Sequence, residues 1–166
     1  VWTIKVRRGI FFAADEAFKG KKRELVAEDY VYSCKRFFDP RWKSPTYASF
    51  SELKILGMDQ LREEVTKNRK TFDYDTPVEG LRALDRYTLQ FRLAQPSPRF
   101  IQMLAGGDVF GALAREVVEH YGDAIMAHPV GTGPFRLGEW RRSSKIVLER
   151  NPDYREHFFD AQPNAD

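Results

Sequence analysis

The sequence predicts an α+β fold built from helices and antiparallel strand pairs. Three observations carry this prediction. Residues 27–38 repeat apolar side chains at the spacing of one helix face, residues 78–93 contain two strand patterns around a two-residue turn, and residues 135–149 contain a second hairpin pattern. Because strands and helices do not alternate one by one, this order indicates antiparallel pairing rather than a parallel sheet with crossover helices.

The composition is that of an ordinary globular domain. Of the 166 residues, 42% are apolar and 31% are charged, and no apolar run approaches the roughly 20 residues that a membrane-spanning helix needs. The 27 basic and 24 acidic residues leave a net charge of +3 that is spread along the chain, so a nucleic-acid partner is not indicated. The densest basic run, GKKR at residues 20–23, is interpreted as a solvated loop tip.

The first predicted element is a strand at the very start of the chain. Trp2, Ile4 and Val6 alternate with polar residues, and Gly9 ends the pattern. No partner strand precedes it. Residues 155–166 are polar and show no pattern of a final helix or strand. We therefore expect the chain to be a fragment of a longer protein whose first strand has lost its N-terminal partners.

The next element is an amphipathic helix over residues 27–38. Glu28 and Asp29 fall in its first turn, where negative charge interacts favourably with the helix dipole, and Asp39 and Pro40 end it. The single cysteine, Cys34, excludes an internal disulfide and is expected to be a buried thiol. The predicted apolar face consists of Tyr30, Val31, Cys34, Phe37 and Phe38.

The rest of the chain up to residue 128 is predicted from shorter patterns. Gly106 and Gly107 break the short apolar helix that starts at Arg99, and Gly122 is a plausible C-terminal cap for the last helix. The predicted elements are a loop over 41–50, a polar helix over 59–67, a hairpin of strands 78–84 and 87–93, and helices over 99–105 and 113–121.

The glycine-rich stretch PVGTGPFRLGEW at residues 129–140 is interpreted as a structural corner. A phosphate-binding loop would open a helix with free amides, whereas here Gly133 is followed by Pro134, which has no N–H, and then by a strand. We expect Gly131 and Gly133 to adopt positive φ and Pro134 to fix the exit into strand 135–140, which pairs with strand 145–149. The predicted structural turn consists of Gly131, Thr132, Gly133 and Pro134.

No catalytic or metal-binding constellation is recognisable. His120, His128 and His157 do not stand at metal-ligand spacings, and no second cysteine assists them. None of the serines lies in a nucleophile-elbow motif, and the many carboxylates cannot be sorted into an acid and a base without geometry. The sequence therefore predicts a protein that is not an enzyme, with no catalytic residues, no metal and no cofactor.

Several segments become recognisable when they are taken together. In this order they resemble the middle of the extracellular solute-binding proteins of family 5, the oligopeptide- and dipeptide-binding group that supplies ABC importers. The resemblance runs from Val1 to Glu156, and five ordered segments make it far more specific than any one of them. The segments are VWTIKVRRG, ELVAEDYVYSCKRFFDP, GLRALDRYTLQFRLAQPSPRF, PVGTGPFRLGEW and KIVLERNPDYRE.

The resemblance implies a two-lobed clamshell, the type II periplasmic-binding-protein fold. Such a protein, secreted to the periplasm by a signal peptide or tethered outside the membrane, captures a peptide or similar small solute and delivers it to permease subunits. It is expected to be a monomer at full length. Residues 1–25 would be the edge of the first lobe, 26–128 its extra α+β subdomain, and 129–166 the returning turn, hairpin and polar tail.

The resemblance also suggests one ligand contact. In oligopeptide-binding relatives a tyrosine in a Ser-Pro-Tyr-Ala-Ser stretch approaches the bound peptide, and SPTYASF here makes Tyr47 the candidate, with an inserted Thr46. The alternative is that Tyr47 only packs its own loop. Val26 stands where the family usually has a helix-capping threonine, so a different cap is needed here.

Two questions stay open at the level of sequence. The residues expected to bind a peptide's amino terminus lie outside this chain, so a peptide cannot be told from nickel, haem, an opine or a sugar as the ligand. The alternative function is a non-catalytic protein–protein interaction module that pairs through exposed strand edges, suggested by the first strand without a visible partner. That alternative predicts self-association that depends on concentration.

Overall fold

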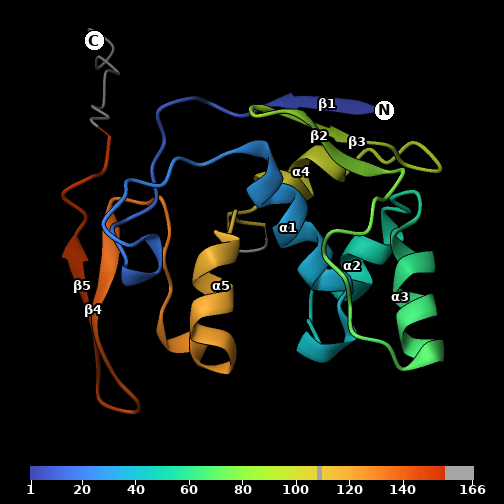
Figure 1. Ribbon diagram of the computed structural model, residues 1–166. Coiled ribbons are helices and arrows are strands. Elements are labelled where there is room, and N and C mark those ends of the chain that lie inside the picture. Colours follow the sequence, from blue (N-terminus) through green and yellow to red (C-terminus); the bar gives the residue numbers. More distant parts are fainter. Residues whose placement is uncertain (108–109, 156–166) are drawn as a thin grey trace, which may run out of the picture.

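The computed structural model describes residues 1–107 and 110–155 and has the predicted mixture of helices and antiparallel strands (Figure 1). A small sheet lies over a group of helices, and a separate hairpin stands at one side of them. The elements are β1 (Trp2–Lys5), η1 (Glu16–Phe18), α1 (Ala27–Phe38), η2 (Pro40–Trp42), α2 (Tyr47–Glu52), α3 (Met58–Asn68), β2 (Leu81–Asp85), β3 (Thr88–Phe91), α4 (Phe100–Ala105), α5 (Arg115–Tyr121), η3 (Gly122–Ala127), β4 (Phe135–Arg141) and β5 (Lys145–Arg150).

The sheet has three antiparallel strands in the order β1-β3-β2. Ile4 of β1 lies opposite Leu89 of β3, and Leu81 of β2 lies opposite Phe91, so apolar side chains of all three strands meet on one face. The predicted first strand and the hairpin are both confirmed. The expectation that the first strand lacks a partner is wrong, because β1 pairs with β3 along one of its two edges.

The core lies between this sheet and the helices beneath it. Helix α1 has the predicted bounds, and Cys34 on its apolar side is fully buried among aromatic and aliphatic side chains. Burial raises the pKa of the Cys34 thiol, which keeps it protonated and unreactive. The largest fully buried apolar side chains are Phe38, Phe50, Phe91, Phe100, Met58 and Leu81, each worth roughly 1.5–3 kcal/mol relative to exposure.

A second cluster of buried side chains attaches α5 to the loop that precedes α1. Phe12, Phe18 and Leu25 pack against Ala114 and Val117. The predicted helices over 59–67, 99–105 and 113–121 correspond to α3, α4 and α5. Gly122 ends α5 with positive φ and donates its N–H to the carbonyl of Val118, as its predicted capping role requires.

The prediction of a loop over residues 41–50 is wrong. The segment contains η2 and the start of α2. Pro40 occupies the first turn of η2, and the Asp39 carboxylate accepts a hydrogen bond from the Arg41 amide at 2.9 Å. Phe50 of α2 is fully buried against Phe37, with ring centroids 4.6 Å apart. Helices this short are held by tertiary packing, which periodicity along the chain does not reveal.

The β4–β5 hairpin is confirmed and stands apart from the sheet (Figure 1). Leu137 pairs with Leu148 and Trp140 with Ile146, so these side chains share one face of the hairpin. That face is open to solvent, with Ile146 exposed by 64% and Leu148 by 60%. The charged side chains of the other face include an Arg136–Glu149 pair, and both residues line a small pocket with residues 13–15 and 127–130.

Candidate ligand contact and the network that supports it

The predicted ligand contact, Tyr47, is the first residue of α2 and is half-buried between two neighbours. Its ring meets Phe38 edge-on with centroids 5.5 Å apart, and the guanidinium carbon of Arg62 lies 3.9 Å from the ring centroid. A cation over an aromatic face contributes about 0.5–1 kcal/mol at an exposed site. One face of the tyrosine is therefore engaged within the protein.

The Tyr47 hydroxyl is less firmly held than the ring. Within residues 1–107 and 110–155 its only hydrogen-bond partner is Asp59 Oδ1, and the distance of 3.4 Å is long for a hydrogen bond. The Ser51 hydroxyl donates to the same oxygen at 2.8 Å and is the better donor. Tyr47 also lines an open groove along α3 with Gln60, Glu63 and other residues. The geometry thus leaves the hydroxyl available to another group, and contact with a ligand stays a prediction.

The glycine-rich corner is held in a different way from the one predicted. Neither Gly131 nor Gly133 adopts positive φ, and a Cβ added at Gly131 would meet nothing within 4 Å. The expectation that these two glycines are required by their backbone conformation is therefore wrong. The carbonyl groups hold the corner instead, since Gly131 O accepts from the Ala13 amide at 2.9 Å and Pro134 O accepts from the Asn151 amide at 2.8 Å.

Asn151 is the residue of this corner that the sequence analysis missed. It is 2% exposed, and its Nδ2 donates to Gly133 O at 2.9 Å while its Oδ1 accepts from the Asp153 amide at 3.1 Å. The signal was present in the sequence, because asparagine directly after a strand and before a proline is typical of a turn closed by the side chain. Thr132 is half-buried within the corner.

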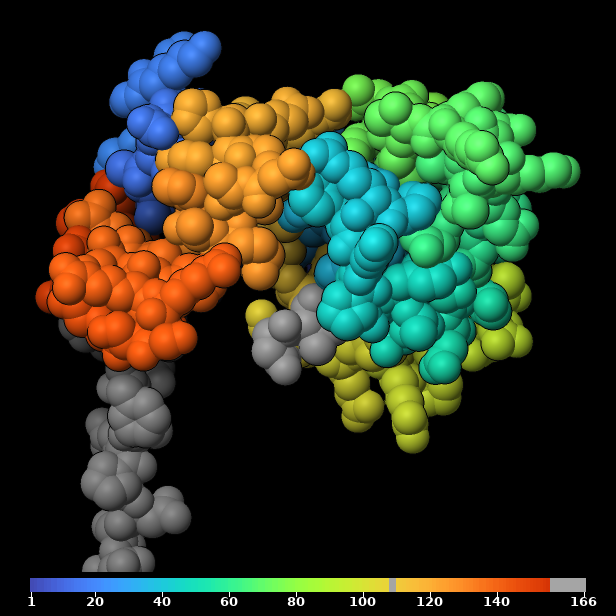
Figure 2. Space-filling model, turned by 90° about the horizontal axis from the view of Figure 1, so that it is seen from below, coloured from blue at the N-terminus to red at the C-terminus, as the bar shows by residue number. Residues whose placement is uncertain are grey.

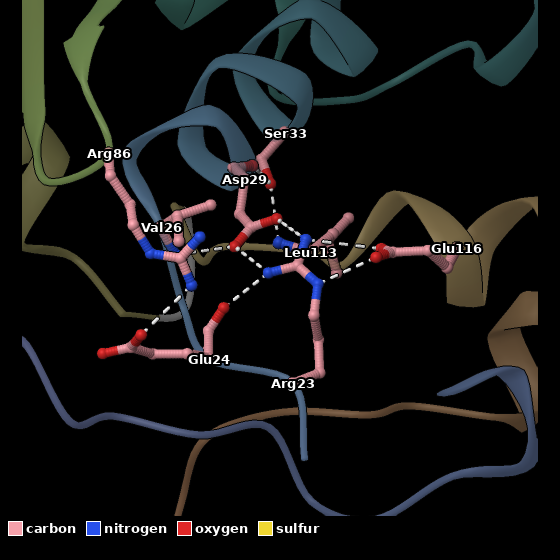
Figure 3. A network of polar contacts seen from close by, with 8 residues as sticks. All are labelled: Arg23, Glu24, Val26, Asp29, Ser33, Arg86, Leu113 and Glu116. Atoms are coloured by element: carbon pink, nitrogen blue, oxygen red, sulfur yellow. Dashed lines mark hydrogen bonds and ion pairs between the residues drawn. The ribbon is translucent and has the colours of Figure 1, made fainter. Parts of the chain in front are cut away.

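Arg23, expected at a solvated loop tip, is instead the centre of an ion-pair network (Figure 3). Its Nη2 lies 2.6 Å from Asp29 Oδ1 and its Nη1 lies 3.1 Å from Asp29 Oδ2, while its Nε donates to Glu116 Oε1 at 2.8 Å. Lys21 and Lys22 of the same run are exposed, as predicted. The network fastens the loop before α1 to both α1 and α5.

Asp29 also supplies one half of a capping box at the start of α1. Its Oδ2 accepts a hydrogen bond from the Val26 amide at 2.8 Å and satisfies that donor, whereas Val26 has no side-chain oxygen for the amides that a threonine hydroxyl would cap. Burial raises the pKa of Asp29, and the hydrogen bonds from Arg23 and the Val26 amide oppose that rise. The same arginine holds the pKa of Glu116 below its usual value against the effect of burial.

Glu24 connects the loop before α1 to the β2–β3 turn as well. Its carboxylate accepts from the Gly9 amide at 2.8 Å, from the Tyr87 hydroxyl at 2.8 Å and from Arg86 Nη2 at 3.2 Å. These hydrogen bonds, that of Gly9 first, hold the pKa of Glu24 below its usual value. Residues 9–24, α1, α5 and the sheet are thereby joined through two adjacent side chains of opposite charge.

The histidines are engaged in pairs. His120 Nε2 lies 3.0 Å from Glu16 Oε1, and the His128 ring stacks on Tyr121 with centroids 3.9 Å apart. His157 lies outside the described residues. In the part of the chain that the structure describes, no group of three or more His, Cys, Asp or Glu side chains could hold a metal ion. None of the helices described is long and apolar enough to cross a bilayer.

Comparison with known proteins places these features in a family. The sequence profile of the bacterial extracellular solute-binding proteins, family 5 Middle, matches residues 1–166. The periplasmic oligopeptide-binding protein OppA of Salmonella typhimurium is 31% identical over 93% of this chain and 26% of its own length. The probable deoxycholate-binding periplasmic protein YgiS of Escherichia coli is 30% identical over 80% of this chain and 23% of its own length.

Solved structures agree with the sequence comparison. The crystal structure of Haemophilus influenzae OppA, in complex with the peptide RPPGFSPFR, superimposes with a TM-score of 0.69 at 26% identity, over 92% of this chain and 27% of that one. The chain thus spans about a quarter of the length of the relatives it matches. Over that stretch it has their α+β fold, and it belongs to the bacterial extracellular solute-binding proteins of family 5.

Proposed function

We propose that this chain is part of the substrate-binding component of an ABC importer. The whole protein would capture peptides or similar small solutes in the periplasm, or outside the cell when tethered to the membrane, and deliver them to the permease subunits without chemical change. The observation that carries this proposal is the 31% identity to a periplasmic oligopeptide-binding protein over 93% of the chain. The fold, which matches a peptide-bound relative, supports it.

We propose further that the chain is a fragment of a two-lobed protein. Residues 1–25 would belong to the edge of the first lobe, residues 26–128 to its extra subdomain and residues 129–166 to the returning segment. The apolar face of the β4–β5 hairpin supports this proposal, because two of its large apolar side chains, Phe135 and Leu148, are 61% and 60% exposed to solvent. Covering such a face with further chain removes apolar area from water.

The mechanism would be closure of the second lobe over the solute. The Arg23–Asp29 and Glu24 contacts tie the loop before α1 to α1 and to the β2–β3 turn, which would suit the lobe that stays still. Contacts that form only in the closed state would then drive closure. Tyr47 would contribute its hydroxyl rather than its ring face, since Arg62 already covers that ring. The solute class is left between peptides and other small solutes, because one relative is named for deoxycholate.

A thermal-unfolding screen of the full-length natural protein tests this function. A ligand at about 100 times its dissociation constant stabilises the folded state by about 2.7 kcal/mol, which raises the unfolding temperature measurably. We expect tri- to pentapeptides to raise it, and amino-acid mixtures of the same composition to leave it unchanged. No shift with peptides, but a shift with bile salts, nickel, haem, opines or sugars, would move the proposal to a non-peptide solute.

A second candidate function, an interaction module that pairs through strand edges, is favoured by one observation. The outer edge of β1 has no partner strand among the described residues, and Trp2 on it is 38% exposed. Sedimentation velocity across a hundredfold concentration range decides between the two. Reversible self-association that a proline at Thr3 abolishes would support the module, whereas a monomer of full-length protein at every concentration would exclude it.

A further inference from the structure

Arg62 of α3 connects the end of α1 to the start of α2. Its Nη1 donates to the carbonyl of Phe38, the last residue of α1, at 2.9 Å, and its guanidinium carbon lies 3.9 Å from the ring centroid of Tyr47. The Phe38 ring meets the same tyrosine edge-on, with centroids 5.5 Å apart. Figure 2 looks onto the underside of the molecule, where α2 lies beside α3. The Tyr47 ring is therefore held by two residues that are themselves joined by a hydrogen bond.

Helix α2 alone does little to hold Tyr47 in place. It has six residues, too few for a helix to be stable in water without tertiary contacts. The side chain of its N-cap residue, Thr46, makes no capping hydrogen bond. Phe50 anchors the helix by packing on Phe37, but Tyr47 stands three residues earlier, in the first turn. The orientation of the tyrosine thus depends on neighbouring elements, and Arg62 supplies the contact over its ring face.

The hydroxyl of Tyr47 does not fix the side chain either. Asp59 Oδ1 lies 3.4 Å away, and the same oxygen accepts a hydrogen bond from the Ser51 hydroxyl at 2.8 Å. The other oxygen of this carboxylate, Oδ2, lies 3.7 Å from Lys54 Nζ. Because the carboxylate is shared with these partners, the contacts of the ring, rather than this long hydrogen bond, determine where the hydroxyl lies.

We propose that Arg62 is a positioning residue for solute binding, whose guanidinium holds the Tyr47 ring at the groove along α3 and so presents the hydroxyl to the solute. This role rests on the proposed function and adds to it a residue that acts on the solute through Tyr47. A guanidinium suits the role because it donates in its plane to the Phe38 carbonyl while its face lies over the ring. Tyr47 and Arg62 both line the open groove.

The charges of the groove favour placement of Tyr47 over a direct anion contact as the role of Arg62. Glu63 and Glu64 line the groove together with Arg62 and Lys67, so positive and negative side chains balance there. Such a groove selects neither an acidic nor a basic solute. The variant Arg62→Lys keeps the charge without the planar group, and it therefore separates the effect of placement from the effect of charge.

A double-mutant cycle in the full-length natural protein tests the role of Arg62. The probe is tetra-alanine, because its small side chains leave the peptide backbone as the main partner for a hydroxyl, and calorimetry gives its dissociation constant. We expect Arg62→Met and Tyr47→Phe each to weaken binding about three- to tenfold, the value of one neutral hydrogen bond. The double variant should bind within about twofold of the weaker single variant, because both changes remove the same contact.

Two further variants complete the cycle. Arg62→Lys should still weaken binding at least about twofold, and it takes the place of Arg62→Met if that variant does not fold. The matched control is Arg69→Met, which removes the same charge from an exposed position at the end of the same helix, outside the lining of the groove. It should leave binding within about twofold of the parent.

A second measurement needs no solute. In protein with isotope-labelled phenylalanine and tyrosine, nuclear Overhauser effects report the contact between the Phe38 and Tyr47 rings, and Tyr47→Phe identifies the tyrosine signal. We expect the effect between these rings to weaken in Arg62→Met and to persist in Arg69→Met, because only the first variant frees the tyrosine ring.

Three results would overturn the proposal. One is unchanged affinity in Arg62→Met. Another is an additive cycle, in which Arg62→Met weakens binding as much in the Tyr47→Phe background as in the parent, because Arg62 would then act without the tyrosine. The third is a contact between the Phe38 and Tyr47 rings that Arg62→Met leaves intact. If the parent binds no tetra-alanine, peptide capture fails as a function, and the ring measurement alone then decides whether Arg62 places Tyr47.

Discussion

Arg23 forms a bidentate ion pair with Asp29, with Nη2 at 2.6 Å from Oδ1 and Nη1 at 3.1 Å from Oδ2. The same carboxylate accepts a hydrogen bond from the Val26 amide at the start of helix α1. One side chain thus holds another in the position that starts a helix. The third contact of the arginine, to Glu116, brings α5 to the same point (Figure 3). The longest helix in the described part of the chain is therefore held at its start by a residue of the preceding loop.

Replacing Arg23 with methionine should lower the free energy of unfolding by roughly 3 kcal/mol. Removing one partner leaves the buried Asp29 carboxylate uncompensated, and such losses cost about 3–5 kcal/mol when both charges are fully buried. The lower end applies because the Arg23 side chain is partly exposed. Urea unfolding at pH 7 measures the change. The matched control is Lys22→Met, whose side chain is 76% exposed and whose loss should cost less than about 0.5 kcal/mol. Equal effects of the two variants would contradict the role of Arg23.

The Glu24 carboxylate should make the free energy of unfolding depend on pH in the acidic range. Its pKa is lower in the folded protein than in the unfolded chain, so its contribution is fully present above the unfolded pKa of about 4.3 and is lost as pH falls through the folded pKa. The variant Glu24→Gln lacks this contribution. We expect it to be less stable than the parent at pH 7, with a stability gap that narrows as pH falls below about 4.3. A stability gap that stays the same throughout the acidic range would show that ionisation of Glu24 is not involved.

Gly80, rather than the glycines of the corner, is the glycine at which an added side chain would collide with backbone atoms. A Cβ at Gly80 would lie 2.3 Å from Leu56 N and 2.7 Å from Arg92 O, both backbone atoms. We expect Gly80→Ala to cost about 3 kcal/mol or more, at or above the upper end of ordinary overpacking. Gly131→Ala should stay within about 0.5 kcal/mol, because open space surrounds that position. Thermal unfolding of the two variants side by side checks both statements, and the reverse ranking would contradict the packing described.

Asn151 should carry much of the stability of the corner. Asn151→Ala removes the donor to Gly133 O inside a buried site, and an unsatisfied buried carbonyl costs about 1–3 kcal/mol. The control Asn68→Ala removes an exposed amide at the end of α3 and should cost less than about 0.5 kcal/mol. The Asp153 amide donates a hydrogen bond to Asn151 Oδ1, so its hydrogen exchange should accelerate in Asn151→Ala and not in Asn68→Ala. Unchanged exchange there would mean that the side chain does not hold the turn.

Tyr47→Phe separates ligand contact from packing. The ring contacts with Phe38 and Arg62 remain, so stability should change by less than about 0.5 kcal/mol. If the hydroxyl contacts the solute, affinity for a bound peptide should fall about three- to tenfold, the value of one neutral hydrogen bond. Calorimetry with the full-length protein measures this. The control Tyr154→Phe should leave affinity unchanged, and unchanged affinity in both would leave Tyr47 as a packing residue.

The sequence predicted the elements whose signals are local. The bounds of α1 follow from an apolar period that begins after Val26 and ends at Asp39, and both hairpins follow from alternation around short turns. Helix α2 was missed because six residues hold too little periodicity, and the burial of Phe50 that stabilises it comes from α1. Local pattern therefore specifies long elements and leaves short ones to tertiary contacts.

The candidate sites were harder to predict for the same reason. Arg23 looked like part of a basic run because its partners are Asp29 and Glu116, the latter 93 residues away in the chain. Tyr47 was proposed only through resemblance to a family, and a groove beside Trp42 is not visible in the sequence because α1, η2, α3, the following loop and α5 all contribute to it. Ion pairs and grooves formed by distant segments require the fold to be known first.

Native mass spectrometry after exposure to a mixed tryptic peptide pool tests the central proposal most directly. The 166-residue chain and the full-length natural protein would be measured side by side, each desalted under conditions that keep ligands bound. The account predicts that only the full-length protein retains peptides, because in the proposed function this chain would supply only one part of the binding cleft. Retention by the 166-residue chain by itself would contradict the proposal that the second lobe is needed to hold the solute, and retention by neither would contradict peptides as the solute.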